Sequence, residues 1–188
     1  KPLFIGEDAY KGKPNPHAWI SPKRGIIYVD TLSRALSELK PQSKTIFKKN
    51  AEIYKNKLLE IDEDFSLFLN TLKKNQKYLV SCEGAFTYLT NDYGLKEAYL
   101  WPVNAESQIT PKRMAKVINL VKTNDIPAVF CESTVSSESQ LAVARETGAK
   151  FGGNFFVDSL SEKNGPASSY IDLLNHNLNL IKQAYSTK

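Results

Sequence analysis

Lys77-Tyr78-Leu79-Val80-Ser81-Cys82-Glu83-Gly84 begins the part of the chain from which the fold can be predicted. This short apolar run, closed by a glycine, is typical of a buried strand, and the chain then alternates strand and helix patterns to its end. We predict strands at about 77–82, 96–100, 127–131 and 154–157, and helices at about 85–93, 111–123, 137–147 and 167–185. Such alternation predicts an α/β fold, a doubly wound four-stranded parallel sheet flanked by helices.

The preceding residues predict two helices. Ser21-Pro22 is a typical helix start, and apolar residues then recur at three- and four-residue steps, which predicts a helix over 22–39. A proline ends that pattern, and one apolar stripe then continues to about residue 74. A single helix of this length spans roughly 50 Å. Two helices broken near residues 62–64 are the alternative.

Two acidic residues directly follow apolar runs of this pattern. Glu83 ends the first run, and Asp158 follows Phe155-Phe156-Val157. In open α/β sheets, ligands bind outside the carboxyl ends of the strands, so both carboxylates are candidates for one cation site. The alternative for each is a role at a helix N-terminus, where acidic residues are favoured.

His17 is the third candidate ligand, one of two histidines in the chain. It lies in Asn15-Pro16-His17-Ala18-Trp19, where the prolines at 14 and 16 restrict the backbone and the tryptophan can pack beneath the loop. A single imidazole on such a stiff loop is suited to metal binding. A half-buried loop histidine that caps a helix is the alternative.

Five short motifs follow one another along the chain. They are Asn-Pro-His-Ala-Trp at 15–19, Ser-Cys-Glu-Gly-Ala-Phe at 81–86, Tyr-Leu-Trp-Pro-Val-Asn at 99–104, Cys-Glu-Ser-Thr at 131–134 and Val-Asp-Ser-Leu at 157–160. In this order and spacing they resemble the substrate-binding proteins of manganese and zinc ABC importers, most of all the manganese-binding branch. The resemblance covers essentially the whole chain and implies two α/β lobes joined by one long rigid helix, with the metal in the cleft between them.

The resemblance also implies a site made of two histidines, one glutamate and one aspartate. It assigns His17, Glu83 and Asp158 to three of these positions. We expect the other histidine upstream of Lys1, in a lobe that this chain does not contain. His176 is not a substitute, because it lies in the last helical segment, where the family has no ligand.

The same resemblance divides the chain and implies its role. Residues 1–40 are then the end of the N-terminal lobe with the ligand loop, 41–75 the interlobe backbone helix and 76–188 the C-terminal α/β lobe. The protein is expected to bind Mn²⁺ or Zn²⁺ as cargo and to deliver it to the membrane permease of an ABC importer. It is expected to act as a monomer, without catalysis, in the periplasm or anchored to the outer face of the cytoplasmic membrane.

Cys82 and Cys131 end the first and third predicted strands, which are neighbours in the common order 2-1-3-4. Neighbouring strands lie about 4.8 Å apart, which suits a disulfide. We therefore expect a Cys82–Cys131 bond, an oxidising compartment and a fixed position for the adjacent Glu83. Metal-bound thiolates or a catalytic cysteine with His17 as base are the alternatives, although no CxxC spacing supports the first. Glu132 is expected to cap a helix or to hydrogen-bond to the site.

Composition excludes other classes of protein. The 188 residues carry a net charge of +5, but lysines alternate with acidic residues, and no basic block of the kind that nucleic-acid binders use is present. No apolar run approaches the roughly 20 residues that span a bilayer.

A surface adhesin or interaction protein with the same fold, or a metalloenzyme, is the alternative function.

The ligand types indicate the metal. Imidazole with two carboxylates is a harder ligand set than those that favour zinc, and the chain has no histidine-rich loop, which zinc-binding members of the family often carry. Manganese is therefore the expected cargo and zinc the alternative. Because most fixed sites bind zinc more tightly than manganese, zinc binding in vitro does not by itself identify the cargo.

Overall fold

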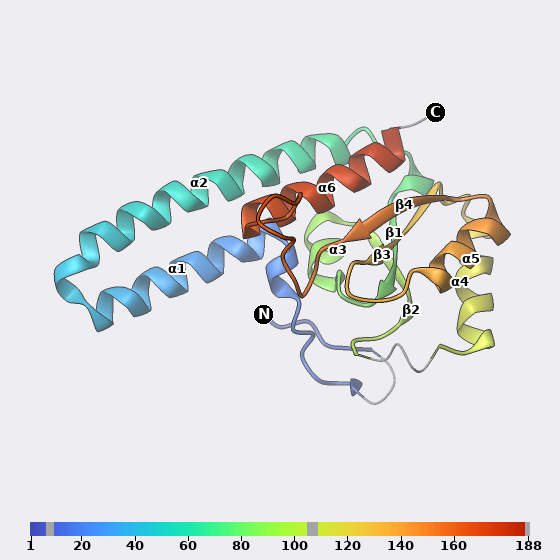
Figure 1. Ribbon diagram of the computed structural model, residues 1–188, viewed down its shortest axis with the longest axis horizontal. Helices are drawn as coiled ribbons and strands as arrows, with labels where there is room; N and C mark the ends of the chain where they lie inside the picture. The colour runs from blue at the N-terminus through green and yellow to red at the C-terminus, as the bar shows by residue number, and fades with distance from the viewer. Residues whose placement is uncertain (7–9, 105–108, 187–188) are drawn as a thin grey trace.

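The computed structural model describes residues 1–6, 10–104 and 109–186. A projecting pair of long helices joins an α/β body (Figure 1). The helices are α1 (Pro22–Leu39), α2 (Lys44–Leu69), α3 (Thr87–Tyr93), α4 (Pro111–Thr123), α5 (Glu138–Thr147) and α6 (Tyr170–Ser186). The strands are β1 (Tyr78–Glu83), β2 (Lys96–Trp101), β3 (Ala128–Glu132) and β4 (Lys150–Phe155). The predicted α/β order of elements is confirmed.

α1 and α2 lie side by side as an antiparallel hairpin, joined through a 3₁₀ turn at Pro41–Ser43 (Figure 1). α2 continues through residues 62–64, so the alternative of two helices broken there is wrong. The reason is a buried stripe at helical spacing that passes through this region, formed by Leu58, Ile61, Phe65 and Leu69. The helix is shorter than predicted, since its 26 residues end at Leu69 and span about 39 Å.

The strands are parallel, as predicted, but they form two hydrogen-bonded pairs, β1 with β2 and β3 with β4. β1 and β3 lie next to each other at the seam, where the disulfide between Cys82 and Cys131 joins them with a Cα separation of 4.8 Å. Side chains satisfy backbone groups there. Gln140 Nε2 donates to the carbonyl of Val80 at 3.2 Å, and the N–H of Glu83 donates to the carboxylate of Glu132. The strands therefore lie in the predicted order β2-β1-β3-β4, but no backbone ladder joins β1 to β3.

β4 begins and ends earlier than the predicted strand at 154–157. The sequence pattern missed its first half, because glycine is a poor strand former. The packing explains the glycine: a Cβ at Gly152 would lie 2.2 Å from the ring of Phe130 on the neighbouring strand. As a result, Asp158 lies in the chain beyond β4 and not directly at its end.

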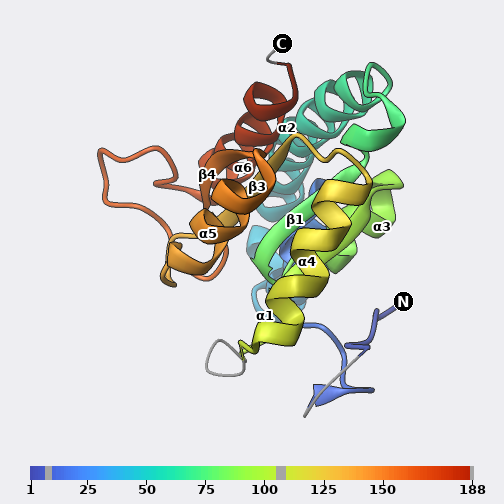
Figure 2. The same ribbon diagram turned by 90° about the vertical axis from the view of Figure 1, so that its right-hand side faces the viewer.

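Buried apolar residues cover both faces of the strands. α4 and α5 lie on the side that faces the viewer in Figure 2, with α2 and α6 behind them. The cluster on the α2 and α6 side includes Leu58, Phe65, Leu89, Phe130, Leu174 and Ile181, and the cluster on the α4 and α5 side includes Val80, Leu100, Val121, Val129 and Val143. The strand ends are thus held in a packed body.

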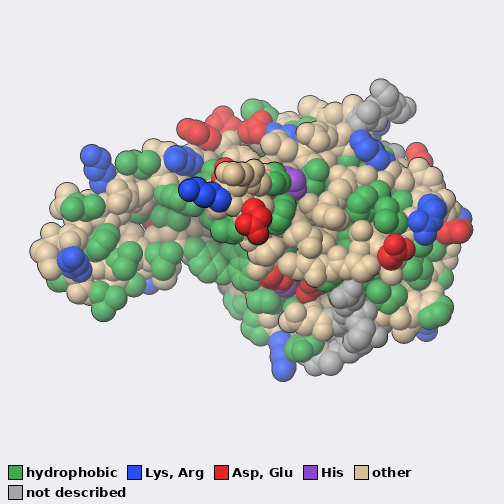
Figure 3. Space-filling view, in the orientation of Figure 1, with side chains coloured by type: hydrophobic (Ala, Val, Ile, Leu, Met, Phe, Trp, Pro, Cys, Tyr) green, Lys and Arg blue, Asp and Glu red, His purple; other side chains and the backbone are tan. Residues whose placement is uncertain are grey.

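The projecting hairpin exposes many apolar side chains (Figure 3). They include Ile27, Tyr28, Leu32, Leu36 and Leu39 on α1 and Ile46, Ile53 and Leu59 on α2. A groove of about 530 Å³ runs between the two helices and reaches Tyr170. Apolar surface of this extent is typical of a contact face. In the described part of the chain, no helix combines the length and apolarity that a membrane span requires.

Replacing both cysteines should measure the contribution of the disulfide between β1 and β3 to the stability of the fold. Because the disulfide closes a loop with a sequence separation of 49, we expect Cys82→Ala with Cys131→Ala to lower the free energy of unfolding. The chain-entropy model gives a loss of about 3–4 kcal/mol. Urea denaturation followed by circular dichroism measures it. A reductant should destabilise the wild type by the same amount and leave the variant unchanged, and equal urea midpoints for variant and wild type would contradict the prediction.

Candidate metal centre

The position of His17 depends on the side chain of Asn15. The amide oxygen of Asn15 accepts from the backbone N–H of His17 at 3.0 Å and lies 3.0 Å from its Nδ1, while the amide nitrogen donates to the carbonyl of Gly84 at 2.8 Å. A fixed donor faces one end of the amide and a fixed acceptor faces the other, so its orientation is determined. Nδ1 of His17 therefore carries the proton, and Nε2 keeps its lone pair.

That free nitrogen faces the carboxylate of Asp158. His17 Nε2 and Asp158 Oδ1 are 3.6 Å apart, which is longer than a normal hydrogen bond. With metal–ligand bonds of about 2.1 Å, this separation corresponds to an angle of about 120° at a shared cation. His17 is 3% exposed, and its burial lowers the pKa of the imidazole, although Asp158 acts in the opposite direction. The imidazole is therefore neutral at pH 7, which is the form that binds metals.

Trp19 fixes the segment that carries Asp158. Its indole N–H donates to the carbonyl of Val157 at 3.2 Å, and its ring meets the ring of His17 edge-on with centroids 5.3 Å apart. The hydroxyl of Tyr170 donates to the carbonyl of Trp19 at 2.6 Å. The loop at 15–19 is thus bound to both strand-end segments, through Gly84 on one side and Val157 on the other.

Glu83, at the end of β1, is held from two directions. Its Oε1 accepts from the backbone N–H of Asn104 at 2.8 Å, and its own N–H donates to the carboxylate of Glu132 at 3.2 Å. Glu83 is 6% exposed and Glu132 is 1% exposed. Burial, and to a smaller extent the charge of Glu83, raises the pKa of Glu132 to about 8. Glu132 thus forms a hydrogen bond to the backbone of Glu83, which agrees with one of the two roles expected for it.

The structure brings His17 and Asp158 into direct opposition and ties Glu83 to them through Gly84. Neither Glu83 nor His17 caps a helix with its side chain, which was the alternative role for each. Phe86 is the N-cap of α3, and His17 precedes the 3₁₀ turn at Ala18–Ile20 without a side-chain bond to it. Chemically, His17 and Asp158 offer an imidazole nitrogen and a carboxylate to one cation, and Glu83 is linked to them through the bond of Gly84 to Asn15.

A second group of potential ligands lies at the seam. Cys82, Cys131 and Glu132 have donor atoms within 4.8 Å of one another. The two sulfurs are joined in a disulfide, so neither is available as a thiolate for a metal or for nucleophilic attack. The expected disulfide is present, and the alternatives of metal-bound thiolates and a catalytic cysteine fail.

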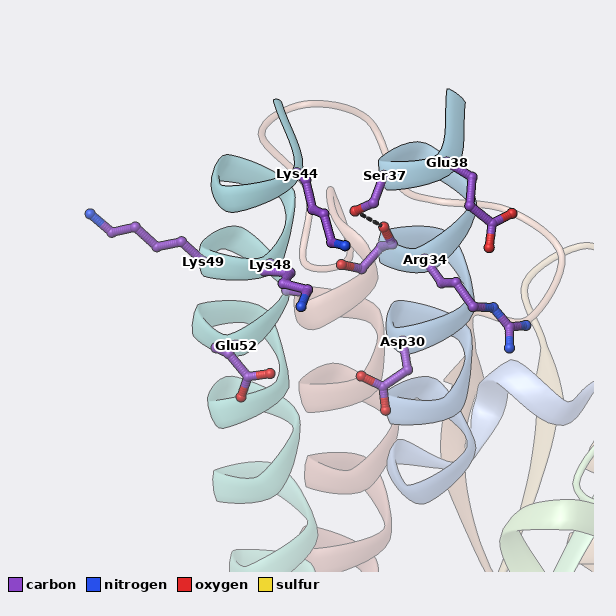
Figure 4. A pocket seen from close by; sticks show the side chains of 10 residues that line it. Asp30, Arg34, Ser37, Glu38, Lys44, Lys48, Lys49 and Glu52 are labelled. Atoms are coloured by element: carbon purple, nitrogen blue, oxygen red, sulfur yellow. Dashed lines mark hydrogen bonds between the residues drawn. The ribbon is translucent and has the colours of Figure 1, made fainter. Parts of the chain in front are cut away.

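A charged hollow of about 620 Å³ lies at the far end of the helix hairpin (Figure 4). Its lining mixes acidic side chains with Arg34, Lys44, Lys48 and Lys49. Lys55 pairs with both Asp30 and Glu52 at 2.8 Å. The lining of the hollow contains no imidazole, and the carboxylates of Asp30 and Glu52 are already paired with Lys55. The hollow is therefore a poor candidate for a metal site.

Sequence reasoning missed the residues that hold the candidate ligands. Asn15 was part of a recognised motif, but its orienting role was not predicted, although asparagine side chains commonly bond the backbone two residues further on. Asn104 acts through its backbone N–H and adopts a positive φ of 54°. Asparagine favours this backbone conformation, but a sequence does not show which acceptor a backbone N–H will meet.

Comparison with known proteins gives a consistent family. The family model described as "Zinc-uptake complex component A periplasmic" (ZnuA) matches residues 4–184. The iron-binding protein YfeA of Yersinia pestis is 42% identical over 184 residues, which cover 98% of this chain and 59% of that protein. The manganese ABC transporter substrate-binding lipoprotein PsaA of Streptococcus mitis is 31% identical over 181 residues, 96% of this chain and 59% of that protein. The chain thus spans 59% of the length of these curated relatives.

Solved structures agree with this result. The manganese-bound periplasmic metal-binding protein of Candidatus Liberibacter asiaticus superposes with a TM-score of 0.88 at 35% identity. The match covers 97% of this chain and 67% of that one. The zinc-binding protein TroA of Treponema pallidum, at 22% identity and a TM-score of 0.85, shares the fold.

Trp19→Phe should test whether the indole N–H positions Asp158. The substitution keeps an aromatic side chain and removes the bond to Val157 together with the second ring of the indole. We expect the affinity for Mn²⁺ to fall roughly tenfold, within the range for the loss of an outer-shell partner. Isothermal titration calorimetry measures the affinity, and thermal unfolding checks the fold. Unchanged affinity in a folded variant would show that this bond does not position Asp158.

Proposed function

The chain belongs to the ZnuA family of periplasmic metal-uptake components, and from this premise we propose that it binds a divalent transition metal and delivers it to the permease of an ABC importer. The observation that carries the proposal is the opposition of His17 Nε2 and Asp158 Oδ1 at 3.6 Å. A buried neutral imidazole that directs its lone pair at a carboxylate is arranged for a cation between them. We propose His17, Glu83 and Asp158 as the metal ligands.

The preferred cargo in this proposal is Mn²⁺, with Zn²⁺ as the alternative. The names of the relatives refer to zinc, iron and manganese, so the choice depends on the ligands of this chain. One imidazole and two carboxylates are harder donors than the thiolate and imidazole sets typical of zinc. Metal analysis of the protein purified without nickel affinity resin tests this choice.

A carrier fits the site better than an enzyme does. Its relatives are named as substrate-binding proteins of ABC transporters. A metalloenzyme needs an open coordination position and a poised base, whereas a carrier can surround its cargo with protein ligands. The expectation of a location outside the cytoplasmic membrane agrees with the periplasmic family and its lipoprotein members. We propose that the protein works there as a monomer.

We further propose that the site is completed by residues outside these 188. The side chain of Asp158 is 45% exposed, so a cation beside it is open to a further ligand. The curated relatives extend beyond the matched part, and the apolar side chains exposed on the α1–α2 hairpin are suited to a contact with a second lobe. In this proposal residues 1–40 belong to the N-terminal lobe, 41–75 to the interlobe helix and 76–188 to the C-terminal lobe.

Removal of a proposed ligand tests the assignment. We expect His17→Ala and Glu83→Ala each to lower the affinity for Mn²⁺ and Zn²⁺ by more than the roughly 10–100-fold that loss of an outer-shell partner costs. His176→Ala is the matched control, because the ring of His176 contacts Phe156 and lies outside the proposed ligand set. Calorimetric titration of the four proteins, wild type included, gives the affinities. Wild-type affinity in a folded Glu83→Ala variant would remove Glu83 from the site.

The proposed completion of the site predicts a difference between this chain and a longer protein that includes the additional lobe. We expect the 188-residue chain to bind Mn²⁺ and Zn²⁺ more weakly, because one imidazole and two carboxylates leave coordination positions to water. Calorimetry on both proteins under identical conditions makes the comparison. Equal affinities would show that the site is complete within residues 1–188 and would exclude a clamp between two lobes.

A further inference from the structure

A chain of hydrogen bonds leads from His17 to a carboxylate that is not a proposed ligand. The amide nitrogen of Asn15 donates to the hydroxyl of Thr87 at 3.1 Å as well as to Gly84. The hydroxyl of Thr87 in turn donates to Glu97 Oε2 at 2.8 Å. Thr87 begins α3 and Glu97 lies on β2, so the chain joins three separate segments.

When the carboxylate of Glu97 is ionised, the donors and acceptors along this chain have a fixed direction. The backbone N–H of Phe86 donates to Glu97 Oε1 at 3.0 Å, and the other oxygen accepts the hydroxyl proton of Thr87. Having given its proton to Glu97, the hydroxyl can only accept from Asn15, which requires the amide nitrogen at that end. The amide oxygen of Asn15 must then face His17, where it accepts from Nδ1–H.

We propose that Glu97 is a positioning residue for the candidate metal centre: acting through Thr87, it reinforces the orientation of the Asn15 amide and so helps to hold the tautomer of His17 that keeps Nε2 free for the cation. The effect on metal affinity rests on the proposed function, whereas the effect on the tautomer does not. Glu97 touches neither the imidazole nor the cargo in this proposal. Together with the N–H of His17 and the carbonyl of Gly84, it determines which end of the Asn15 amide faces the ring.

The competing explanation is that Glu97 only stabilises the start of α3, through the bond from Phe86 N–H. Glu97→Gln separates the two roles. Because the N–H of Phe86 is a fixed donor, the new amide must place its oxygen there and its nitrogen at Thr87. The cap is kept, but the hydroxyl of Thr87 now accepts from position 97, and its proton is free to turn towards the amide of Asn15. The bond between Asn15 and Thr87 then no longer has a fixed direction, so one constraint on the orientation of the Asn15 amide is removed.

The experiment is a double-mutant cycle of Glu97→Gln and Thr87→Val, with Thr87→Ser as the conservative control that keeps the hydroxyl. Burial raises the pKa of Glu97 to about 7, so the measurements are made at pH 8, where its carboxylate is ionised. Imidazole ¹⁵N shifts of the metal-free proteins report the tautomer of His17. His176, the second of the two histidines, serves as the internal reference.

We expect the Nδ1–H tautomer in the wild type and in Thr87→Ser, and a shift towards Nε2–H in Glu97→Gln. Affinity for Mn²⁺ should fall about tenfold in Glu97→Gln, as for other outer-shell partners. In the Thr87→Val background the same substitution should change neither the tautomer nor, by more than about twofold, the affinity, because the connection to Asn15 is already cut. Thermal unfolding controls for the fold of each variant.

An unchanged His17 tautomer in folded Glu97→Gln would overturn the proposal, as would an equal effect of that substitution with and without the hydroxyl of Thr87. If the wild type binds no metal, the proposed function fails, but the imidazole shifts of the metal-free proteins still decide the role of Glu97. If Thr87→Val does not fold, a wild-type tautomer in Thr87→Ser together with a changed one in Glu97→Gln supports the proposal, and any other result contradicts it.

Discussion

The amide of Asn15 is the contact on which the candidate centre depends. It bonds to the carbonyl of Gly84, directly after Glu83, and faces His17 with its oxygen. A single side chain therefore fixes the distance between two segments and the tautomer of the ring between them. Because the amide makes its bonds in a buried setting, an incorrect orientation would leave several polar groups unpaired, each at a cost of about 1–3 kcal/mol. These bonds hold the loop at 15–19 firmly against the α/β body.

The other side of Glu83 depends on the seam between β1 and β3. An ordinary ladder would bond the backbones of these strands directly, and here a disulfide and two buried side chains replace it. The side-chain carboxyl group of Glu132 takes the place of a backbone acceptor for the N–H of Glu83, at the cost of being buried. In return, the position of Glu83 is set by a covalent bond at the preceding residue and a hydrogen bond at its own nitrogen. As a proposed ligand held by its backbone in this way, Glu83 would need little reorganisation when a cation arrives.

Much of this arrangement could be predicted from the sequence, and the exceptions have physical causes. The apolar runs placed β1 and β3 well and so led to the disulfide, because register and spacing follow from burial. The prediction misplaced β4 because glycine has a low strand propensity, whereas Gly152 leaves room for the ring of Phe130. The choice between one long helix and two could not be made from charges at 62–64, whereas the buried stripe through Ile61 and Phe65 decides it. The sequence identified His17, Glu83 and Asp158 as candidate ligands. The hydrogen bonds of Asn15 and Asn104 that orient His17 and Glu83 could not be predicted, because they depend on tertiary contacts.

The three proposed ligands differ in how firmly they are held, and this difference bears on how a carrier can bind and release its cargo. His17 and Glu83 are nearly inaccessible, whereas the side chain of Asp158 is 45% exposed. Asp158 is positioned through the backbone of the preceding residue, by the indole of Trp19. A cation can therefore meet the exposed carboxylate first and exchange its remaining water for the imidazole afterwards, without disturbing the buried bonds of Asn15. In the proposed carrier, release would follow the reverse path, since a displacement of the segment at Asp158 would open one side of the proposed site while the imidazole and Glu83 stay in place. In the proposed carrier, the Asp158 segment is thus the part on which another lobe or the permease can act.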